Sequence, residues 1–145
     1  MIVYVSKRFE ATPVEFKTDF EESVWISLKL KQRGDLLIGC IYRSPNSTAE
    51  NNQALLDLLH NVSVSKYLLK VITGDFNLPE IDWSNLVSVK TGFDLNFVDC
   101  VNDCFFYQHV IEPTRARIGQ RANTLDLILT NFEEMIKSIT YESPL

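Results

Sequence analysis

The chain has 145 residues and a formal net charge of −5, and this length is enough for one domain with a buried core. Apolar residues make up 46% of the sequence and charged residues 23%, a balance typical of globular domains. No apolar run approaches the length of a membrane span, so we expect no membrane partner. The acidic balance argues against a protein that binds nucleic acid mainly through non-specific attraction to phosphates.

The first half of the chain predicts strands followed by a helix. Residues 2–6 have the composition of a strand and lack the basic lead of a signal peptide. Residues 24–30 and 36–42 flank a polar run with a glycine, which predicts a β-hairpin. Ser47, with Glu50 three residues later, has the spacing of a capping box and predicts the start of a helix.

The second half of the chain alternates strands with one more helix. Residues 68–73 are apolar and β-branched and predict a buried strand. Residues 94–104 have the apolar spacing of an amphipathic helix. Three further strands are expected at 105–110, 125–130 and 136–141. Strands interspersed with helices predict a layered α/β fold.

The three cysteines, Cys40, Cys100 and Cys104, do not predict a disulfide framework, because their number is odd. Cys100 and Cys104 lie four residues apart on the predicted second helix, and no histidine is near them in the sequence. We therefore expect buried, reduced thiols rather than a zinc site. Reduced thiols in turn favour a nuclear or cytoplasmic location.

The most informative segment is Gly74-Asp75-Phe76-Asn77, which ends the buried strand at 68–73. Asp75 and Asn77 lie two residues apart, so an extended backbone points both side chains the same way. A carboxylate that activates water and an amide that donates to a phosphoryl oxygen suit phosphodiester hydrolysis. The alternative is a plain Asx turn, because Asp and Asn beside Gly are common turn residues.

Two other segments place polar groups near strand ends, where sites of α/β proteins tend to form. Tyr42 offers a hydroxyl and Asn46 an amide, and both can hold a phosphate without adding charge. Asp126 is a lone carboxylate within an apolar strand, so we expect it to be buried with a partner. That partner is a neighbouring loop, an arginine, or a catalytic histidine that Asp126 orients.

One basic cluster stands out, made by Arg115, Arg117 and Arg121 in a loop with Gly119. On charge alone, a solvated loop is the simpler interpretation of these arginines.

These motifs resemble the endonuclease/exonuclease/phosphatase superfamily, and most closely the endonuclease domain of non-LTR retrotransposons. The similar segments are Tyr-Arg-Ser-Pro-Asn at 42–46, Gly-Asp-Phe-Asn-Leu-Pro at 74–79, Glu-Pro-Thr-Arg at 112–115 and Asn-Thr-Leu-Asp-Leu-Ile-Leu-Thr-Asn at 123–131. The resemblance implies a DNase I-like fold, a four-layer α/β/β/α sandwich. It also implies that residues 1–145 are a partial domain, truncated at both ends.

The resemblance further implies a role for each matching residue. Asp75 would activate the attacking water and lie at Mg²⁺ (or Mn²⁺). Asn77 would stabilise the pentacovalent phosphate, and Tyr42 and Asn46 would hold the phosphate. Asp126 would orient the family's catalytic histidine. The three arginines would bind DNA.

The sequence also departs from the family's pattern. The family's catalytic histidine lies beyond a Pro-Leu like that at 144–145, and its metal-binding glutamate lies upstream of a strand like residues 2–6. Neither His60 nor His109 occupies the histidine's place. We therefore expect little or no activity, since loss of one member of a catalytic unit typically costs several orders of magnitude in rate. We also expect self-association through an exposed sheet edge.

Three functions stay open at this point. The first is a metal-dependent, DNA-nicking endonuclease domain of retrotransposon origin. The second is a phospholipid or RNA phosphodiesterase of the same superfamily. The third is a catalytically dead remnant that binds nucleic acid or a protein.

Overall fold

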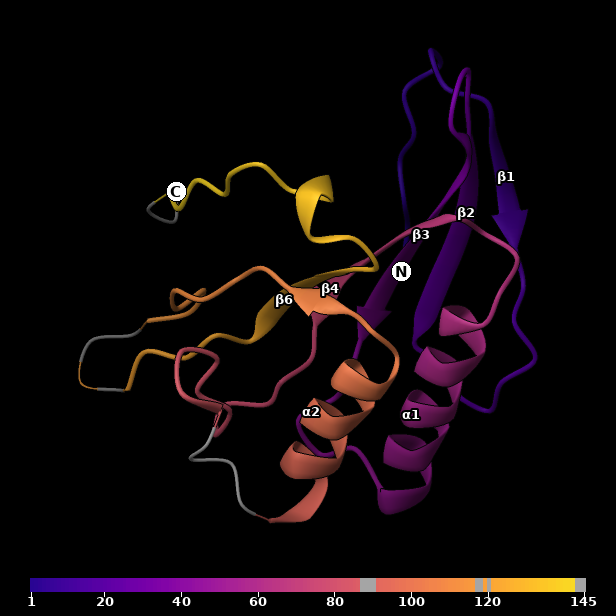
Figure 1. The fold of residues 1–145 in the computed structure, drawn as a ribbon. Helices are drawn as coiled ribbons and strands as arrows, with labels where there is room; N and C mark the ends of the chain where they lie inside the picture. The colour runs from indigo at the N-terminus through magenta and orange to yellow at the C-terminus, as the bar shows by residue number, and fades with distance from the viewer. Residues whose placement is uncertain (87–90, 117–118, 120, 143–145) are drawn as a thin grey trace.

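The computed structural model describes residues 1–86, 91–116, 119 and 121–142. These residues form one six-stranded sheet in the order β1-β2-β3-β4-β6-β5, with two α-helices (Figure 1). The β3–β4 pair is parallel and the other pairs are antiparallel. The elements are β1 (Ala11–Val14), β2 (Ser23–Leu30), β3 (Gly34–Tyr42), α1 (Ala49–Ser63), β4 (Leu69–Asp75), α2 (Gly92–Asp103), β5 (Tyr107–Gln108), β6 (Asp126–Thr130) and a 3₁₀ turn at Glu133–Met135.

Both helices lie side by side on the same face of the sheet (Figure 1). Their apolar stripes pack against the strand residues that alternate toward them, and this layer forms the hydrophobic core. Burial of each large apolar side chain stabilises the fold by roughly 1.5–3 kcal/mol. The fully buried residues of this core include Leu37, Ile41, Leu55, Leu58, Leu59, Val62, Ile72, Phe97, Leu127 and Leu129.

The predicted hairpin is confirmed, and the predicted first helix is displaced by one residue at its start. Strands β2 and β3 pair over their full length around a turn that ends at Gly34, whose φ is +75°. Thr48, not Ser47, caps α1: its hydroxyl accepts from the Asn51 backbone N–H at 3.1 Å. Ser47 instead accepts from the Asn51 side-chain amide at 2.9 Å.

Two predicted strands are wrong, because neither segment pairs with a strand among the residues that the structure describes. Residues 2–6 form no ladder, and Ile2 and Tyr4 are exposed. Residues 136–141 are also irregular, and the Tyr141 hydroxyl accepts long hydrogen bonds from the backbone of Ile111 and Glu112. A strand needs a partner for its backbone groups, which an apolar pattern alone does not supply.

The strand expected at 105–110 is also shorter than predicted and spans Tyr107–Gln108 alone. Phe105, with a φ of +56°, cannot continue an extended backbone. At the other end, the Gln108 side chain bonds both backbone groups of Val110 and closes a turn.

Candidate active site

Three of the predicted site residues lie in one row across the ends of three neighbouring strands. Tyr42 is the register partner of Asp75 in the parallel β3–β4 pair, and Asp75 is the register partner of Asp126 in the antiparallel β4–β6 pair. Directly opposed residues project from the same face of a sheet and lie within contact range. This face points away from the helices, because the adjacent Ile41 and Leu127 are buried in the helical core.

The close approach of β4 to β3 depends on Gly74, near the end of β4. Its φ is +153°, and a side chain there would collide with the backbone of Ile41 on β3. A glycine lets the two strand ends approach closely as the chain leaves the sheet. The backbone of Phe76 then bonds to Leu125, which ties the start of the loop to β6.

Asp75 is a half-buried carboxylate at the centre of the row. Its Oδ1 accepts from the Asn77 backbone N–H at 3.1 Å, and its Oδ2 lies 3.4 Å from Nη2 of Arg115. Burial, followed by repulsion from Asp126, raises the pKa of Asp75. The Asn77 N–H and Arg115 act in the opposite direction. The result is a desolvated carboxylate that accepts a proton or a cation readily.

Arg43, a residue given no role from the sequence, holds the loop that follows β4. Its side chain is 6% exposed. Nη1 donates to the carbonyls of Phe76 at 3.2 Å and Asn77 at 3.0 Å, and Nε donates to Oδ1 of Asn52 on α1 at 2.8 Å. The guanidinium also lies 4.9 Å from the centre of the Phe93 ring.

The side chain of Asn77 in turn bonds to the backbone of Arg43. Its side-chain amide donates to the Arg43 carbonyl at 2.8 Å, and its own φ is +48°. Burial lowers the pKa of the Arg43 guanidinium, and Asp94 and Glu22 oppose that effect; arginine stays charged in proteins. Arg43 and Asn77 therefore fix the loop and orient the Asn77 amide beside Asp75.

The segment that carries Arg115 and Arg121 lies beside the loop that follows β4. An antiparallel β-bridge pairs Arg115 with Asn123. Arg115 reaches Asp75, and Arg121 lies 4.0 Å from the Glu80 carboxylate in an exposed pair. Arg117 is outside the described residues. The structure thus brings Arg115 into the site and leaves Arg121 on the surface next to it.

Comparison with known proteins identifies the family to which this chain belongs. The sequence profile of the family described as endonuclease-reverse transcriptase matches residues 36–144, which include all the motifs above. The chain belongs to this endonuclease-reverse transcriptase family. It is a member of the endonuclease/exonuclease/phosphatase superfamily of phosphodiesterases and nucleases. A comparison with curated proteins gave no sequence match.

Two solved structures share the fold of this family member. One is the endonuclease domain of TRAS1, a telomere-specific non-LTR retrotransposon, which is 10% identical in sequence and superposes with a TM-score of 0.63. The match covers 88% of this chain and 55% of the TRAS1 chain. An endonuclease/exonuclease/phosphatase from Beutenbergia cavernae is 13% identical with a TM-score of 0.51 and covers 84% and 37%. The fold is therefore a partial α/β DNase I-like one. The chain spans just over half of the first structure and less of the second.

Asp126 differs from the expectation of a buried, partnered carboxylate. It is exposed at the first position of β6, and its backbone N–H donates to the Thr114 hydroxyl at 3.1 Å. Neither histidine contacts it in the described part of the chain. His60 lies on α1 beside Cys104, and Nε2 of His109 is 2.6 Å from the Thr130 hydroxyl. The expectation of burial is wrong because strand β6 begins at Asp126, at the open end of the sheet.

The two phosphate-holding candidates are free to bind a ligand. Tyr42 is 43% exposed, and its hydroxyl has no hydrogen bond to any described residue. Asn46 is exposed in the turn after β3; its backbone N–H is 3.4 Å from the Ser44 hydroxyl, and its side chain is likewise without a partner among residues 1–86, 91–116, 119 and 121–142. Asn46 follows β3 at the same end of the sheet.

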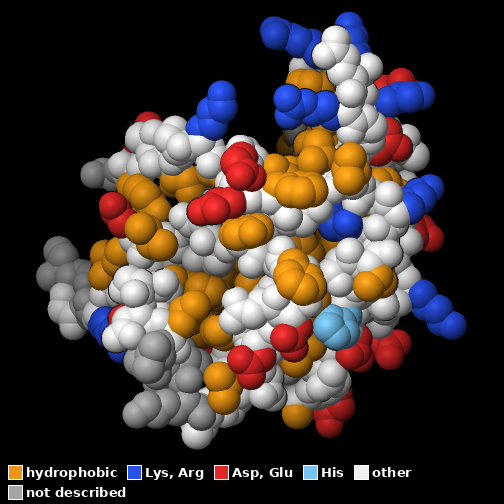
Figure 2. All heavy atoms as spheres, in the orientation of Figure 1, with side chains coloured by type: hydrophobic (Ala, Val, Ile, Leu, Met, Phe, Trp, Pro, Cys, Tyr) orange, Lys and Arg blue, Asp and Glu red, His pale blue; other side chains and the backbone are white. Residues whose placement is uncertain are grey.

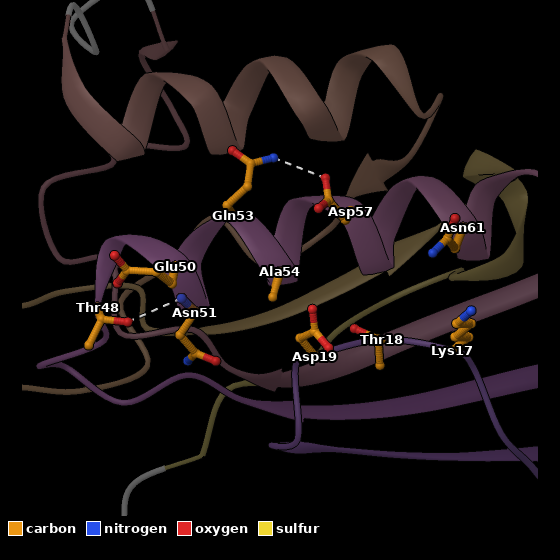
Figure 3. Close-up of a pocket in the computed structure, with 10 residues that line it drawn as sticks. All are labelled: Lys17, Thr18, Asp19, Thr48, Glu50, Asn51, Gln53, Ala54, Asp57 and Asn61. Atoms are coloured by element: carbon orange, nitrogen blue, oxygen red, sulfur yellow. Dashed lines mark hydrogen bonds between the residues drawn. The ribbon is translucent and has the colours of Figure 1, made fainter.

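A wide cleft of about 730 Å³ lies elsewhere, between α1 and the segment at 17–19 (Figure 3). Two of its polar side chains bond to each other, Gln53 donating to Asp57 at 2.9 Å. The chemistry of the family motifs is not there. A smaller groove of about 240 Å³ lies between the loop at 79–84 and residues 121–124, just before β6. We therefore place the site at the ends of β3, β4 and β6.

Proposed function

We propose that this chain forms the phosphate-binding and metal-binding part of a DNA-nicking endonuclease of retrotransposon origin. The observation that carries the proposal is the row Tyr42–Asp75–Asp126, with Asn77 fixed beside it. The motifs that supply these residues lie within the segment that matches the family profile. The TRAS1 relative, a retrotransposon endonuclease domain, supports DNA as the substrate.

The donors at this edge fit a divalent cation such as Mg²⁺ or Mn²⁺. Mg²⁺ prefers oxygen ligands, keeps several waters and binds proteins through one or two carboxylates. Asp75, which Asp126 repels and Arg115 attracts, offers such a carboxylate. When bound, the metal neutralises charge on the phosphoryl oxygens and lowers the pKa of a bound water.

Each side chain of the site can take one role in phosphodiester hydrolysis. Asp75, with its raised pKa, accepts a proton from the attacking water. The Asn77 amide donates to a phosphoryl oxygen as negative charge builds there. The Tyr42 hydroxyl and the Asn46 amide hold the phosphate, and Arg115 adds positive charge beside it.

We further propose that the chain by itself cleaves DNA poorly. Proton transfer to the leaving oxygen needs a general acid, and no imidazole contacts Asp126 or Asp75 in the described residues. Binding of DNA does not need that acid. The chain would then retain nucleic-acid binding while hydrolysis falls by orders of magnitude.

A test of this proposal measures DNA binding and nicking on the same samples. Fluorescence anisotropy with a duplex oligonucleotide is expected to show binding that Mg²⁺ strengthens and that Arg115→Ala weakens several-fold. Arg33→Ala, which removes an equal charge from the β2–β3 turn, is the matched control and should bind as the wild type does. DNA binding that is absent, or equally weakened by both variants, would contradict the proposal.

The same samples are then incubated with supercoiled plasmid, with and without Mg²⁺. We expect nicking at background for the wild type and for Asp75→Ala. Mg²⁺-dependent nicking that disappears in Asp75→Ala would overturn the proposed lack of activity while supporting the endonuclease site. Mg²⁺-dependent hydrolysis of a phospholipid phosphodiester to a phosphomonoester and an alcohol, in the absence of DNA binding, would favour another branch of the superfamily.

A further inference from the structure

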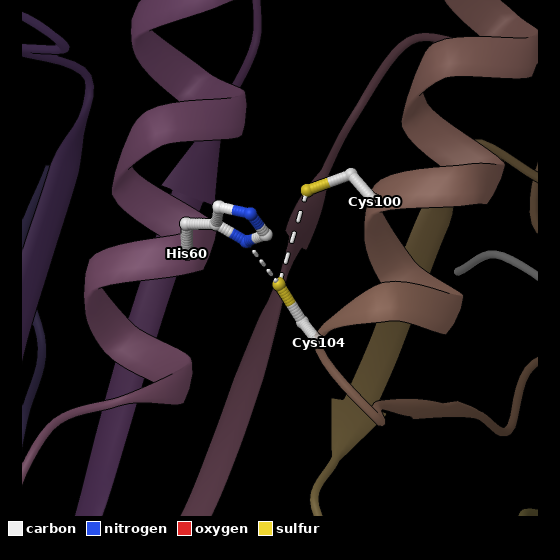
Figure 4. Close-up of side chains that lie close together, drawn as sticks. All are labelled: His60, Cys100 and Cys104. Atoms are coloured by element: carbon white, nitrogen blue, oxygen red, sulfur yellow. Dashed lines mark hydrogen bonds between the residues drawn. The ribbon is translucent and has the colours of Figure 1, made fainter.

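The structure brings one histidine and two cysteines together far from the Asp75 row. His60 lies near the end of α1, and Cys100 and Cys104 lie in and directly after the last turns of α2 (Figure 4). Nδ1 of His60 is 3.0 Å from Sγ of Cys104, and the two sulfur atoms are 4.0 Å apart. The three ligand atoms all lie within 4.8 Å of one another.

These distances are close to the ligand spacing of a tetrahedral zinc site, which small side-chain movements would reach. With Zn–S bonds of about 2.3 Å and Zn–N bonds of about 2.0 Å, two sulfur ligands stand about 3.7 Å apart, and nitrogen and sulfur about 3.5 Å. The sulfur–sulfur distance needs a change of only a few tenths of an ångström. His60 is exposed, so its ring can move away from Cys104 by a similar amount.

The surroundings of the cluster suit a cation that is open to solvent on one side. Cys100 and Cys104 are 8% and 6% exposed, whereas His60 is exposed and projects from α1 toward the two sulfur atoms. A groove of about 240 Å³ runs over the cluster, and its lining includes Asp57, Asp99 and Asp103. Figure 2 shows acidic side chains on both sides of an exposed imidazole over α1 and α2. These carboxylates attract a cation and leave room for water.

Zinc binding at this cluster would release the thiol protons of Cys100 and Cys104 to solvent, because the thiolate is the form of cysteine that binds a metal.

We propose that His60, Cys100 and Cys104 bind Zn²⁺ between α1 and α2, with a water molecule as the fourth ligand. Such an ion would link the ends of the two helices and stabilise the helical layer. The zinc site lies between the two helices, whereas the Asp75 row lies on the opposite face of the sheet. Its ligands are soft sulfur and nitrogen atoms rather than the oxygen atoms of that row, so the two sites suit different metals.

The first test is titration of the fully reduced 145-residue chain with Zn²⁺ in a calorimeter. We expect one ion per chain and a higher melting temperature in its presence. His60→Asn, Cys100→Ser and Cys104→Ser should each weaken binding by more than the roughly 10–100-fold that loss of an outer-shell partner costs. Cys40→Ser and His109→Asn are the matched controls, since both residues lie outside the cluster, and they should leave affinity unchanged.

The second test uses the unmodified chain, so it does not depend on whether a variant folds. Zn²⁺ is expected to protect Cys100 and Cys104 from alkylation, read by peptide mass spectrometry, while Cys40 reacts equally with and without the ion. Co²⁺ should give a thiolate-to-cobalt absorption band in the wild type and Cys40→Ser but not in Cys104→Ser. No saturable zinc binding, or equal protection of all three thiols, would overturn the proposal.

Discussion

At the scale of single residues, the pKa of Asp75 is set by influences that act in opposite directions. Burial and Asp126 raise its pKa, and the Asn77 N–H and Arg115 lower it. We therefore expect Asp126→Asn to lower the pKa of Asp75 and Arg115→Gln to raise it. NMR titration of the Asp75 carboxyl carbon measures both shifts. Shifts in the same direction would contradict this description of the site.

The sign of the pH dependence follows from the same residue. A carboxyl whose pKa is higher in the folded than in the unfolded state holds its proton longer when folded. The stability that this proton contributes is present below the unfolded pKa and is lost as pH rises through the folded pKa. Asp75→Asn should therefore remove a fall in the free energy of unfolding over that interval, which denaturant melts at a series of pH values would detect.

At the scale of elements, Arg43 connects the end of β3 to the loop after β4 and to α1. Arg43→Lys keeps the charge but loses the planar fork that bonds two carbonyls and Asn52. Because the carbonyls would then be buried without a donor, we expect a loss of about 2–4 kcal/mol in the free energy of unfolding.

Urea denaturation measures this loss, and Arg33→Lys in the exposed β2–β3 turn is the matched control. The control should change stability by no more than about 0.5 kcal/mol. If Arg43→Lys is as stable as Arg33→Lys, the loop does not depend on the Arg43 fork.

The same scale shows which parts of the molecule could be predicted from sequence. The hairpin, β4 and both helices could be predicted, because the local apolar periodicity and the positions of the glycines determine them. Residues 2–6 carried a strand's composition but have no partner strand. The contact of His60 with Cys104 spans 44 residues and depends on how α1 docks on α2. Arg43 was unassigned because its role depends on burial under the loop.

At the scale of the whole molecule, the sheet has one covered face and one open face. Among the described residues, both helices pack on the same side, and the other side carries a cross-strand row of Ile26, Ile38 and Val71, all half-exposed. The expected self-association stays a prediction, and this face is a better route for it than the edges. The edge strand β1 has four residues and contains Pro13, which lacks a backbone donor.

Sedimentation velocity over a range of concentrations tests this prediction. We expect the wild-type chain to form dimers or larger species, because a contiguous apolar face favours burial. Ile38→Glu, in the centre of the row, should shift the chain toward monomer, whereas Leu68→Glu, at an exposed position before β4, should not. A wild-type chain that remains monomeric at every concentration would contradict it.

The proposed site depends most on Asp75 as a ligand for a divalent cation. The direct measurement is paramagnetic broadening of backbone amide signals by Mn²⁺. We predict that signals of residues 75–77 and of Asp126 broaden first in the wild type, and that Mg²⁺ in excess restores them. Asp75→Asn should abolish this selectivity. Broadening that is confined to other acidic residues, or that is unchanged in Asp75→Asn, would contradict the assignment of this strand edge as the metal and phosphate site.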